Sequence, residues 1–126
     1  MDKQSVVQRL KELNVYQLFS YRPELKVVPA ALPEGETLEA ATAGISNGKR
    51  WMLVFGQSHV YFIHVHPING THTRKVPYAD LSNYQVNKGL LFGKIMFELG
   101  EETIKVENCH RRTMRQVQEV LDQYAG

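Results

Sequence analysis

Cysteine and long apolar runs are both scarce in this sequence. A single cysteine in 126 residues excludes an internal disulfide framework and is typical of proteins in a reducing cytoplasm. No apolar run approaches the roughly 20 residues that a bilayer requires, and the first residues, MDKQSVVQRLKEL, lack the continuous apolar stretch of a signal peptide. We therefore expect a cytoplasmic protein without a transmembrane helix.

An excess of charge of one sign is also lacking. Fifteen Lys and Arg residues against thirteen Asp and Glu residues give a formal net charge of +2. This value is too close to zero to indicate a dedicated nucleic-acid-binding protein or a polybasic membrane protein, so we expect no nucleic-acid partner. The hydrophobic residues, 43% of the chain, are sufficient for one buried core in a chain of single-domain length.

The first thirty-one residues are predicted to form a helical extension. Four apolar residues recur with the spacing of an amphipathic helix, and Asn14 follows as a helix end. Three prolines between residues 23 and 33 then disfavour one continuous long helix. The four apolar residues are Val6, Val7, Leu10 and Leu13.

Residues 35–107 have the turn signals of antiparallel β structure. Asn47-Gly48 and Asn69-Gly70 are strong hairpin signals, and the segments between such breaks have the length of strands. Residues 36–45 are ambiguous, because three alanines favour a helix although a strand is the alternative. The other predicted strands are residues 51–55, 59–65, 73–78, 83–86, 90–99 and 103–107.

The last part of the chain, residues 108–125, is predicted to be an amphipathic helix with Asn108 as its N-cap. Its apolar stripe must be buried against the sheet. The fold class is therefore mainly β with helices: about seven antiparallel strands curl into a barrel or sandwich that the C-terminal helix caps. The stripe contains Met114, Val117, Val120, Leu121 and Tyr124.

Three segments resemble bacterial pleckstrin-homology-like (PH-like) domains of the YokE type. LPEGETLEAATAGI resembles their first strand, WMLVFGQSHVYFIHV their second and third strands, and VPYADLSNYQVNKGLLFGKIMFEL their most characteristic turn and strand. The resemblance covers about residues 32–124 and implies that 36–45 is a strand. It divides the chain into an N-terminal helical extension, 1–31, and a PH-like domain, 32–126. The turn Gly56-Gln57-Ser58-His59 departs from the family, since it lacks the Thr and Arg often found there.

Histidines are the first candidates for a chemical site. His64 and His66 share one face of a predicted strand, with His72 nearby in sequence and His59 on the opposite face. This spacing is compatible with a metal site. However, no glutamate follows at the distance that a cupin-like metal motif needs, so ordinary surface histidines are the favoured interpretation and we expect no cofactor.

No catalytic constellation is predicted. Cys109-His110 and Ser58-His59 are adjacent pairs, whose side chains are not expected to converge as a nucleophile and base must. A cysteine at a helix N-terminus can have a lowered pKa, but a packed structural thiol is the favoured alternative. Residues 89–94 depart from the spacing of a phosphate-binding loop. No carboxylate has an apolar setting that would raise its pKa; those considered are Glu34, Glu36, Glu39, Glu101 and Glu102.

Basic residues beside the two predicted hairpins are candidates for an anionic ligand or surface. Lys49 and Arg50 follow Asn47-Gly48, and Arg74 and Lys75 follow the second hairpin signal. The resemblance adds that PH domains which bind phosphoinositides hold the headgroup with basic residues around the first hairpin. Solvated hairpins are the alternative interpretation.

These features favour a non-enzymatic PH-like interaction module of bacterial or phage type, which contacts a protein partner and self-associates. Exposed sheet edges and apolar patches would supply the contacts. The N-terminal helix either folds onto its own domain or exchanges between subunits, which makes Val6, Leu10 and Leu13 candidate interface residues. The alternatives are weak binding of an anionic lipid surface through the four basic residues, and a small metalloprotein or enzyme that uses His64, His66 and Cys109.

Overall fold

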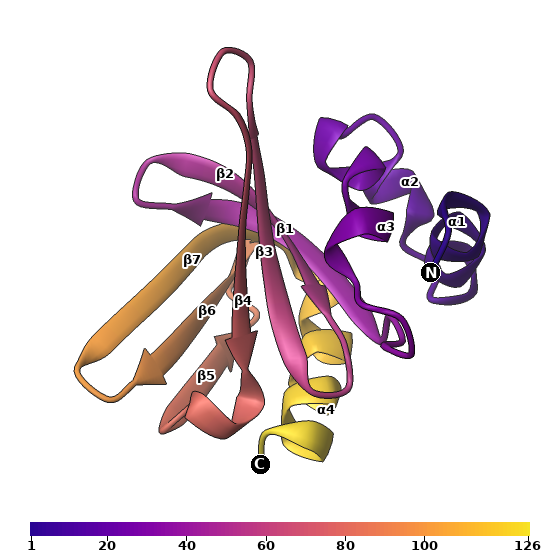
Figure 1. Ribbon diagram of the computed structural model, residues 1–126. Coiled ribbons are helices and arrows are strands. Elements are labelled where there is room, and N and C mark those ends of the chain that lie inside the picture. Colours follow the sequence, from indigo (N-terminus) through magenta and orange to yellow (C-terminus); the bar gives the residue numbers. More distant parts are fainter.

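Seven antiparallel strands form one curled sheet in the computed structural model, which describes residues 1–126 (Figure 1). The strands run in the order β4-β3-β2-β1-β7-β6-β5, so that two meanders meet where β1 lies beside β7. The predicted class, mainly β with about seven strands and a C-terminal helix, is confirmed. The strands are β1 (Ala40–Ser46), β2 (Lys49–Phe55), β3 (His59–His66), β4 (Gly70–Pro77), β5 (Asn83–Asn87), β6 (Phe92–Leu99) and β7 (Glu102–His110).

The hairpin between β1 and β2 forms where the Asn-Gly signal predicted it. Asn47 and Gly48 have φ angles of 51° and 75°, and Ser46 pairs with Lys49 across this two-residue turn. The pair formed by β3 and β4 is longer than predicted, because β4 begins at Gly70, which pairs with His66. The hairpin of β3 and β4 therefore projects far beyond the rest of the sheet in Figure 1.

The ambiguous segment, residues 36–45, becomes a strand from Ala40 onward, as the resemblance implied. β1 is a central strand with hydrophobic clusters on both faces, and its alanines are buried. A central strand that is covered on both faces and lies close to β7 has room only for small side chains. A Cβ on Gly44 would lie 2.6 Å from the carbonyl oxygen of Glu107 on β7. Long-range packing thus overrides the helical preference of the alanines.

The prediction of a helix that begins at Asn108 is wrong. β7 continues to His110, and Cys109 and His110 still pair with Gly93 and Phe92 on β6. A short 3₁₀ turn (Arg111–Thr113) follows, and helix α4 covers Met114–Tyr124. The predicted apolar stripe of this helix is confirmed, since Met114, Val117, Val120 and Leu121 are buried.

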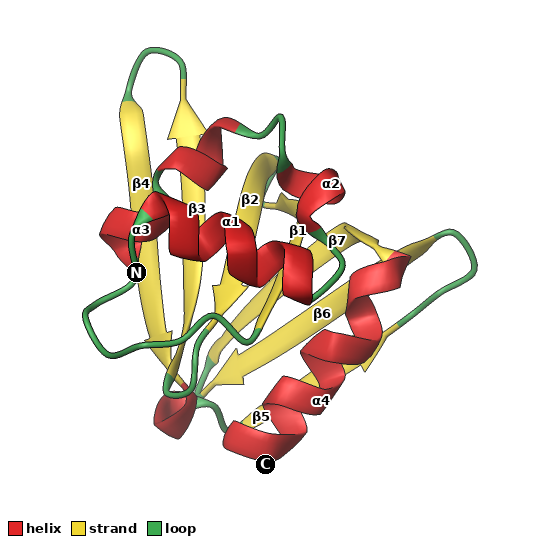
Figure 2. Cartoon of the chain, turned by 90° about the vertical axis from the view of Figure 1, so that its right-hand side faces the viewer, coloured by secondary structure: helices red, strands yellow, loops and turns green.

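Each face of the sheet has its own hydrophobic cluster. On the inner face, α4 packs against residues such as Leu53, Phe62 and Phe97. On the outer face, residues 1–31 cover Met52, Val54 and Tyr61 among others. Figure 2 shows the N-terminal helices over β2 and β3, and α4 over β5 and β6. The N-terminal elements are α1 (Lys3–Glu12), α2 (Tyr16–Phe19), η1 (Pro23–Lys26) and α3 (Val28–Ala31).

The amphipathic helix α1 folds onto the sheet of its own chain. Val6 and Leu10 are 1% and 0% exposed, and Leu13 is half-buried beside them. Asn14, with a φ of 62°, ends the helix as predicted. These side chains could serve as a subunit interface only if the helix exchanged between chains. No helix of the protein is both long enough and apolar enough to cross a membrane.

Candidate functional site

Three consecutive apolar residues are exposed to solvent where the turn between β5 and β6 enters β6. Leu90, Leu91 and Phe92 are 96%, 79% and 59% exposed, and we call them the apolar tip. The prediction that a strand begins at residue 90 is wrong, because β6 starts at Phe92. Exposed apolar clusters of this kind commonly mark interaction sites.

The conformation of this turn depends on its glycine. Gly89 has a φ of 65°, and a Cβ at this position would overlap the carbonyl oxygen of Phe92. Arg111 Nε donates a hydrogen bond of 3.2 Å to the Gly89 carbonyl oxygen, which ties the turn to the end of β7. The apolar tip is therefore held by specific local contacts.

Positive charge surrounds the apolar tip. Lys88 and Lys94 are exposed on either side of it in the sequence, and Arg111 is hydrogen-bonded to the Gly89 carbonyl oxygen of the turn. Neither residues 81–97 nor residues 108–118 contain a single Asp or Glu. The sequence carried a signal for this site, because three successive apolar residues after Lys-Gly cannot all face the same side of a strand.

The four basic candidates do not form one site. Arg74 makes two hydrogen bonds of 2.7 Å to the Glu102 carboxylate, which joins the edge strand β4 to the start of β7. Its neighbour Lys75 points to the opposite face of β4, beside Tyr61. Lys49 and Arg50 are exposed at the start of β2 and make no ion pair.

The histidines of the β3–β4 hairpin are occupied by local hydrogen bonds. His64 Nδ1 lies 2.7 Å from the Arg50 carbonyl oxygen, and the His66 Nδ1 accepts from the backbone N–H groups of Ile68 and Asn69. The His64 ring stacks on His72 at 6.0 Å. No three His, Cys, Asp or Glu side chains are grouped so that they could hold a metal ion.

The prediction that Ser58 and His59 would not converge is wrong. They lie at the tight turn between β2 and β3, where the alternation of strand side chains ends, and Ser58 Oγ is 2.7 Å from His59 Nδ1. Ser58 Oγ also donates a hydrogen bond of 2.7 Å to Glu36 Oε2. Glu36 Oε2 accepts a second hydrogen bond, of 2.9 Å, from the Tyr61 hydroxyl. The Ser58 hydroxyl proton is therefore donated to the Glu36 carboxylate. This hydrogen bond links the β2–β3 turn to the segment that precedes β1.

Glu36 is buried, yet its pKa is not raised. Burial acts to raise the pKa of this carboxyl, but hydrogen bonds from Ser58, the Gln57 backbone and Tyr61, together with nearby His59, outweigh it and hold the pKa below its ordinary value. The prediction that this carboxylate has no raised pKa is confirmed. Its arrangement is that of a structural anion rather than a general acid.

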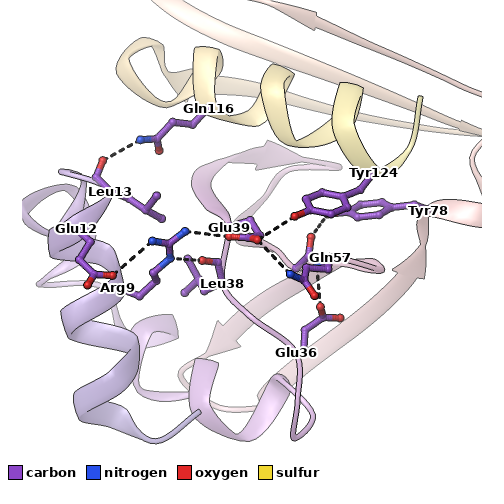
Figure 3. A network of polar contacts seen from close by, with 11 residues as sticks. Arg9, Glu12, Leu13, Glu36, Leu38, Glu39, Gln57, Tyr78, Gln116 and Tyr124 are labelled. Carbon is purple, nitrogen blue, oxygen red and sulfur yellow. Dashed lines mark hydrogen bonds and ion pairs between the residues drawn. The ribbon is translucent and has the colours of Figure 1, made fainter.

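A second polar network ties the N-terminal extension to the rest of the chain (Figure 3). Arg9 Nε donates to the Leu38 carbonyl oxygen at 2.7 Å, and its Nη2 contacts Glu39 Oε2 at 2.9 Å. The other oxygen of Glu39 accepts from the Tyr124 hydroxyl of α4 at 3.1 Å. Gln116 adds a 2.8 Å bond from α4 to the Leu13 carbonyl oxygen. Helices α1 and α4, far apart in sequence, are thereby joined.

Cys109 lies in β7 and not at a helix N-terminus, so the reason for a lowered pKa disappears. It is 0% exposed, and burial raises the pKa of its thiol to about 11, with a smaller opposing contribution from Thr42. The structure places Cys109 as the packed thiol that was the favoured alternative.

This burial predicts an unreactive thiol. At pH 8 we expect Cys109 of the folded protein to react with a chromogenic disulfide reagent more than about 100-fold more slowly than in urea, because both access and thiolate formation are suppressed. Stopped-flow absorbance measures both rates. Equal rates in the folded and unfolded protein would contradict the buried position.

Comparisons with known proteins agree on the fold. A sequence profile described as bacterial PH domain matches residues 32–123. A solved pleckstrin homology domain from Shewanella amazonensis SB2B is 19% identical with a TM-score of 0.55, covering 79% of this chain and 92% of its own. A DUF1696 family protein with a pleckstrin-homology domain from Shewanella loihica PV-4 is 12% identical with a TM-score of 0.59, covering 100% and 95%. No match was found among curated proteins.

Proposed function

The chain belongs to the bacterial PH domain family, and from this premise we propose that it is a non-enzymatic interaction module which binds a protein partner through the apolar tip. The observation that carries the proposal is the exposure of Leu90, Leu91 and Phe92 on a turn that a glycine and Arg111 hold in place. A prearranged apolar group loses little conformational freedom when it is buried by a partner.

The charges around the apolar tip define the chemistry of the partner. Lys88, Lys94 and Arg111 form a basic rim with no acidic residue among the neighbouring segments. A matching surface therefore has an apolar pocket with an acidic rim. If the apolar tips of two copies of this chain paired, their basic rims would repel each other. A different protein is therefore favoured over a second copy as the partner at this site.

Leu91 is the position at which the proposal is tested. A photo-crosslinking residue placed at Leu91 is expected to capture the partner in extracts of the source organism. The same residue at Ile68, a similarly exposed apolar position on the β3–β4 turn, is not expected to capture it. With the captured partner purified, Leu91→Ser is expected to weaken binding by about tenfold or more in calorimetry, because burial of a leucine contributes about 1.5–3 kcal/mol.

Ile68→Ser is the matched control and should leave the affinity unchanged. The charge reversal Lys88→Glu should slow association and reduce its dependence on salt. A partner that crosslinks equally at both positions, or that binds Leu91→Ser as tightly as the unmodified protein, would overturn the proposal.

A further inference from the structure

Strand β4 forms one edge of the sheet, and the outer row of its backbone groups has no partner. β4 pairs with β3 alone, and the pairing runs without a register shift from His66 and Gly70 to His59 and Pro77. No other backbone hydrogen bond of the protein involves residues 70–77. The opposite edge strand, β5, has five residues against the eight of β4. A long, regular edge of this kind is a template to which another strand can pair.

A groove of about 660 Å³ follows the outer face of this edge. One wall is β4, where Thr71, Thr73 and Lys75 alternate along the strand and therefore share a face. The other wall is formed by η1 and α3, with Lys26 and Ala30, and Figure 2 shows α3 beside β4. Both elements precede the part of the chain that the family profile matches, so the groove exists only because the N-terminal extension docks on the sheet.

The groove contains positive charge without a counter-charge. Lys26 and Lys75 line it, no Asp or Glu does, and neither lysine takes part in an ion pair. Arg74, the neighbour of Lys75, faces the inner side of the sheet and is paired with the Glu102 carboxylate. The unpaired lysine charge beside this edge therefore lies on the outer face, toward the groove.

We propose that an extended acidic segment of a partner protein adds to β4 as an eighth strand of the sheet. Its backbone pairs with the outer row of β4, and every second side chain faces the groove because strand side chains alternate. Carboxylates at these positions meet Lys75 across the new strand pair and Lys26 on the far wall. A second copy of β4 is disfavoured as the occupant, since two Arg74-Lys75 pairs would then lie at one edge.

Three labelled octapeptides with blocked ends serve as probes. The first alternates Glu with Val, so that all its carboxylates share one face when it is extended. The second has Lys in place of every Glu, and the third is the first with N-methyl groups on its fourth and fifth residues, which interrupt the donors of both edges. Fluorescence anisotropy is expected to give a dissociation constant below about 100 μM for the first peptide and at least about tenfold weaker binding of the other two.

Charge reversals locate the bound peptide. Lys75→Glu and Lys26→Glu, both at exposed positions, should each weaken binding of the alternating Glu peptide about tenfold or more. Lys105→Glu is the matched control and should leave the affinity unchanged, because Lys105 is an exposed strand lysine that makes no ion pair and lies outside the groove. Hydrogen exchange of the β4 amides should slow only when this peptide is present.

The proposal is overturned if the alternating Glu peptide does not bind at about 1 mM, or if the N-methylated peptide binds equally tightly. It is also overturned if Lys105→Glu weakens binding as much as Lys75→Glu does. Slow exchange of the β4 amides in the concentrated protein without peptide would overturn it too, because a second copy would then occupy the edge. Leu91→Ser should bind the peptide as the unmodified protein does, so these outcomes are independent of the apolar tip.

Discussion

Replacing Glu36 with glutamine is expected to lower the free energy of unfolding by about 3 kcal/mol. The carboxylate accepts hydrogen bonds from Ser58, the Gln57 backbone and Tyr61, and bonds to a charged acceptor contribute about 1.5–3 kcal/mol each. A glutamine side chain has only one acceptor oxygen, and an NH₂ donor replaces the second carboxylate oxygen. At least one of the three groups that donate to Glu36 therefore loses its acceptor. The site is also tight, because a Cβ on Gly56 would overlap the Glu36 carboxyl group.

Glu36 should also make stability depend on pH. Its pKa in the folded protein lies below the ordinary value of 4.5, which its counterpart in the unfolded chain retains. The stabilisation is therefore complete above pH 4.5 and is lost as the pH falls through the lower, folded value. Urea unfolding of the unmodified protein should weaken through this acidic range, whereas the stability of Glu36→Gln should change less.

Glu34→Gln is the matched control for this experiment, since Glu34 is exposed on the same turn and makes no hydrogen bond through its side chain. Its unfolding should be within about 0.5 kcal/mol of the unmodified protein. If Glu36→Gln behaved in the same way as Glu34→Gln, the network around the β2–β3 turn would not stabilise the fold.

Leu10→Ala is expected to lower the free energy of unfolding by about 3 kcal/mol, and deletion of residues 1–31 should be more severe still. Leu10 is completely buried between α1 and the outer face of the sheet, and truncating a buried leucine costs about 2–5 kcal/mol. Deletion would expose the outer faces of β1, β2 and β3, including Met52, Val54 and Ile63. A sheet with such a face in water is expected to aggregate.

Circular dichroism during urea titration and light scattering of the truncated chain measure these effects. Gln8→Ala is the control, because Gln8 lies on the exposed side of the same helix. A chain of residues 32–126 that stayed monomeric and unfolded cooperatively would show that the predicted division at residue 31 separates an independent domain from a dispensable extension. Loss of cooperative unfolding would show that the extension is part of one folding unit.

Local sequence patterns were sufficient to predict those turns and helices that are determined by residues adjacent in the sequence. The Asn47-Gly48 turn requires positive φ angles that few other residues adopt, and the apolar spacing of α1 and α4 matches the helical repeat. The helix boundary at Asn108 was wrong because the pairing of Cys109 and His110 with β6 is a long-range contact, which no local capping signal reveals. For the same reason, residues 36–45 required a family resemblance to be assigned as a strand.

The candidate sites depended more strongly on contacts between distant residues. Lys49, Arg50, Arg74 and Lys75 were visible in the sequence as two basic pairs, but the pairing of Arg74 with the Glu102 carboxylate exists only in the folded sheet. Turn preferences and amphipathic repeats arise from neighbouring residues, so a linear pattern records them. The burial of Glu24 and Glu36 arises from chain segments that meet only after folding, so no linear pattern contains it.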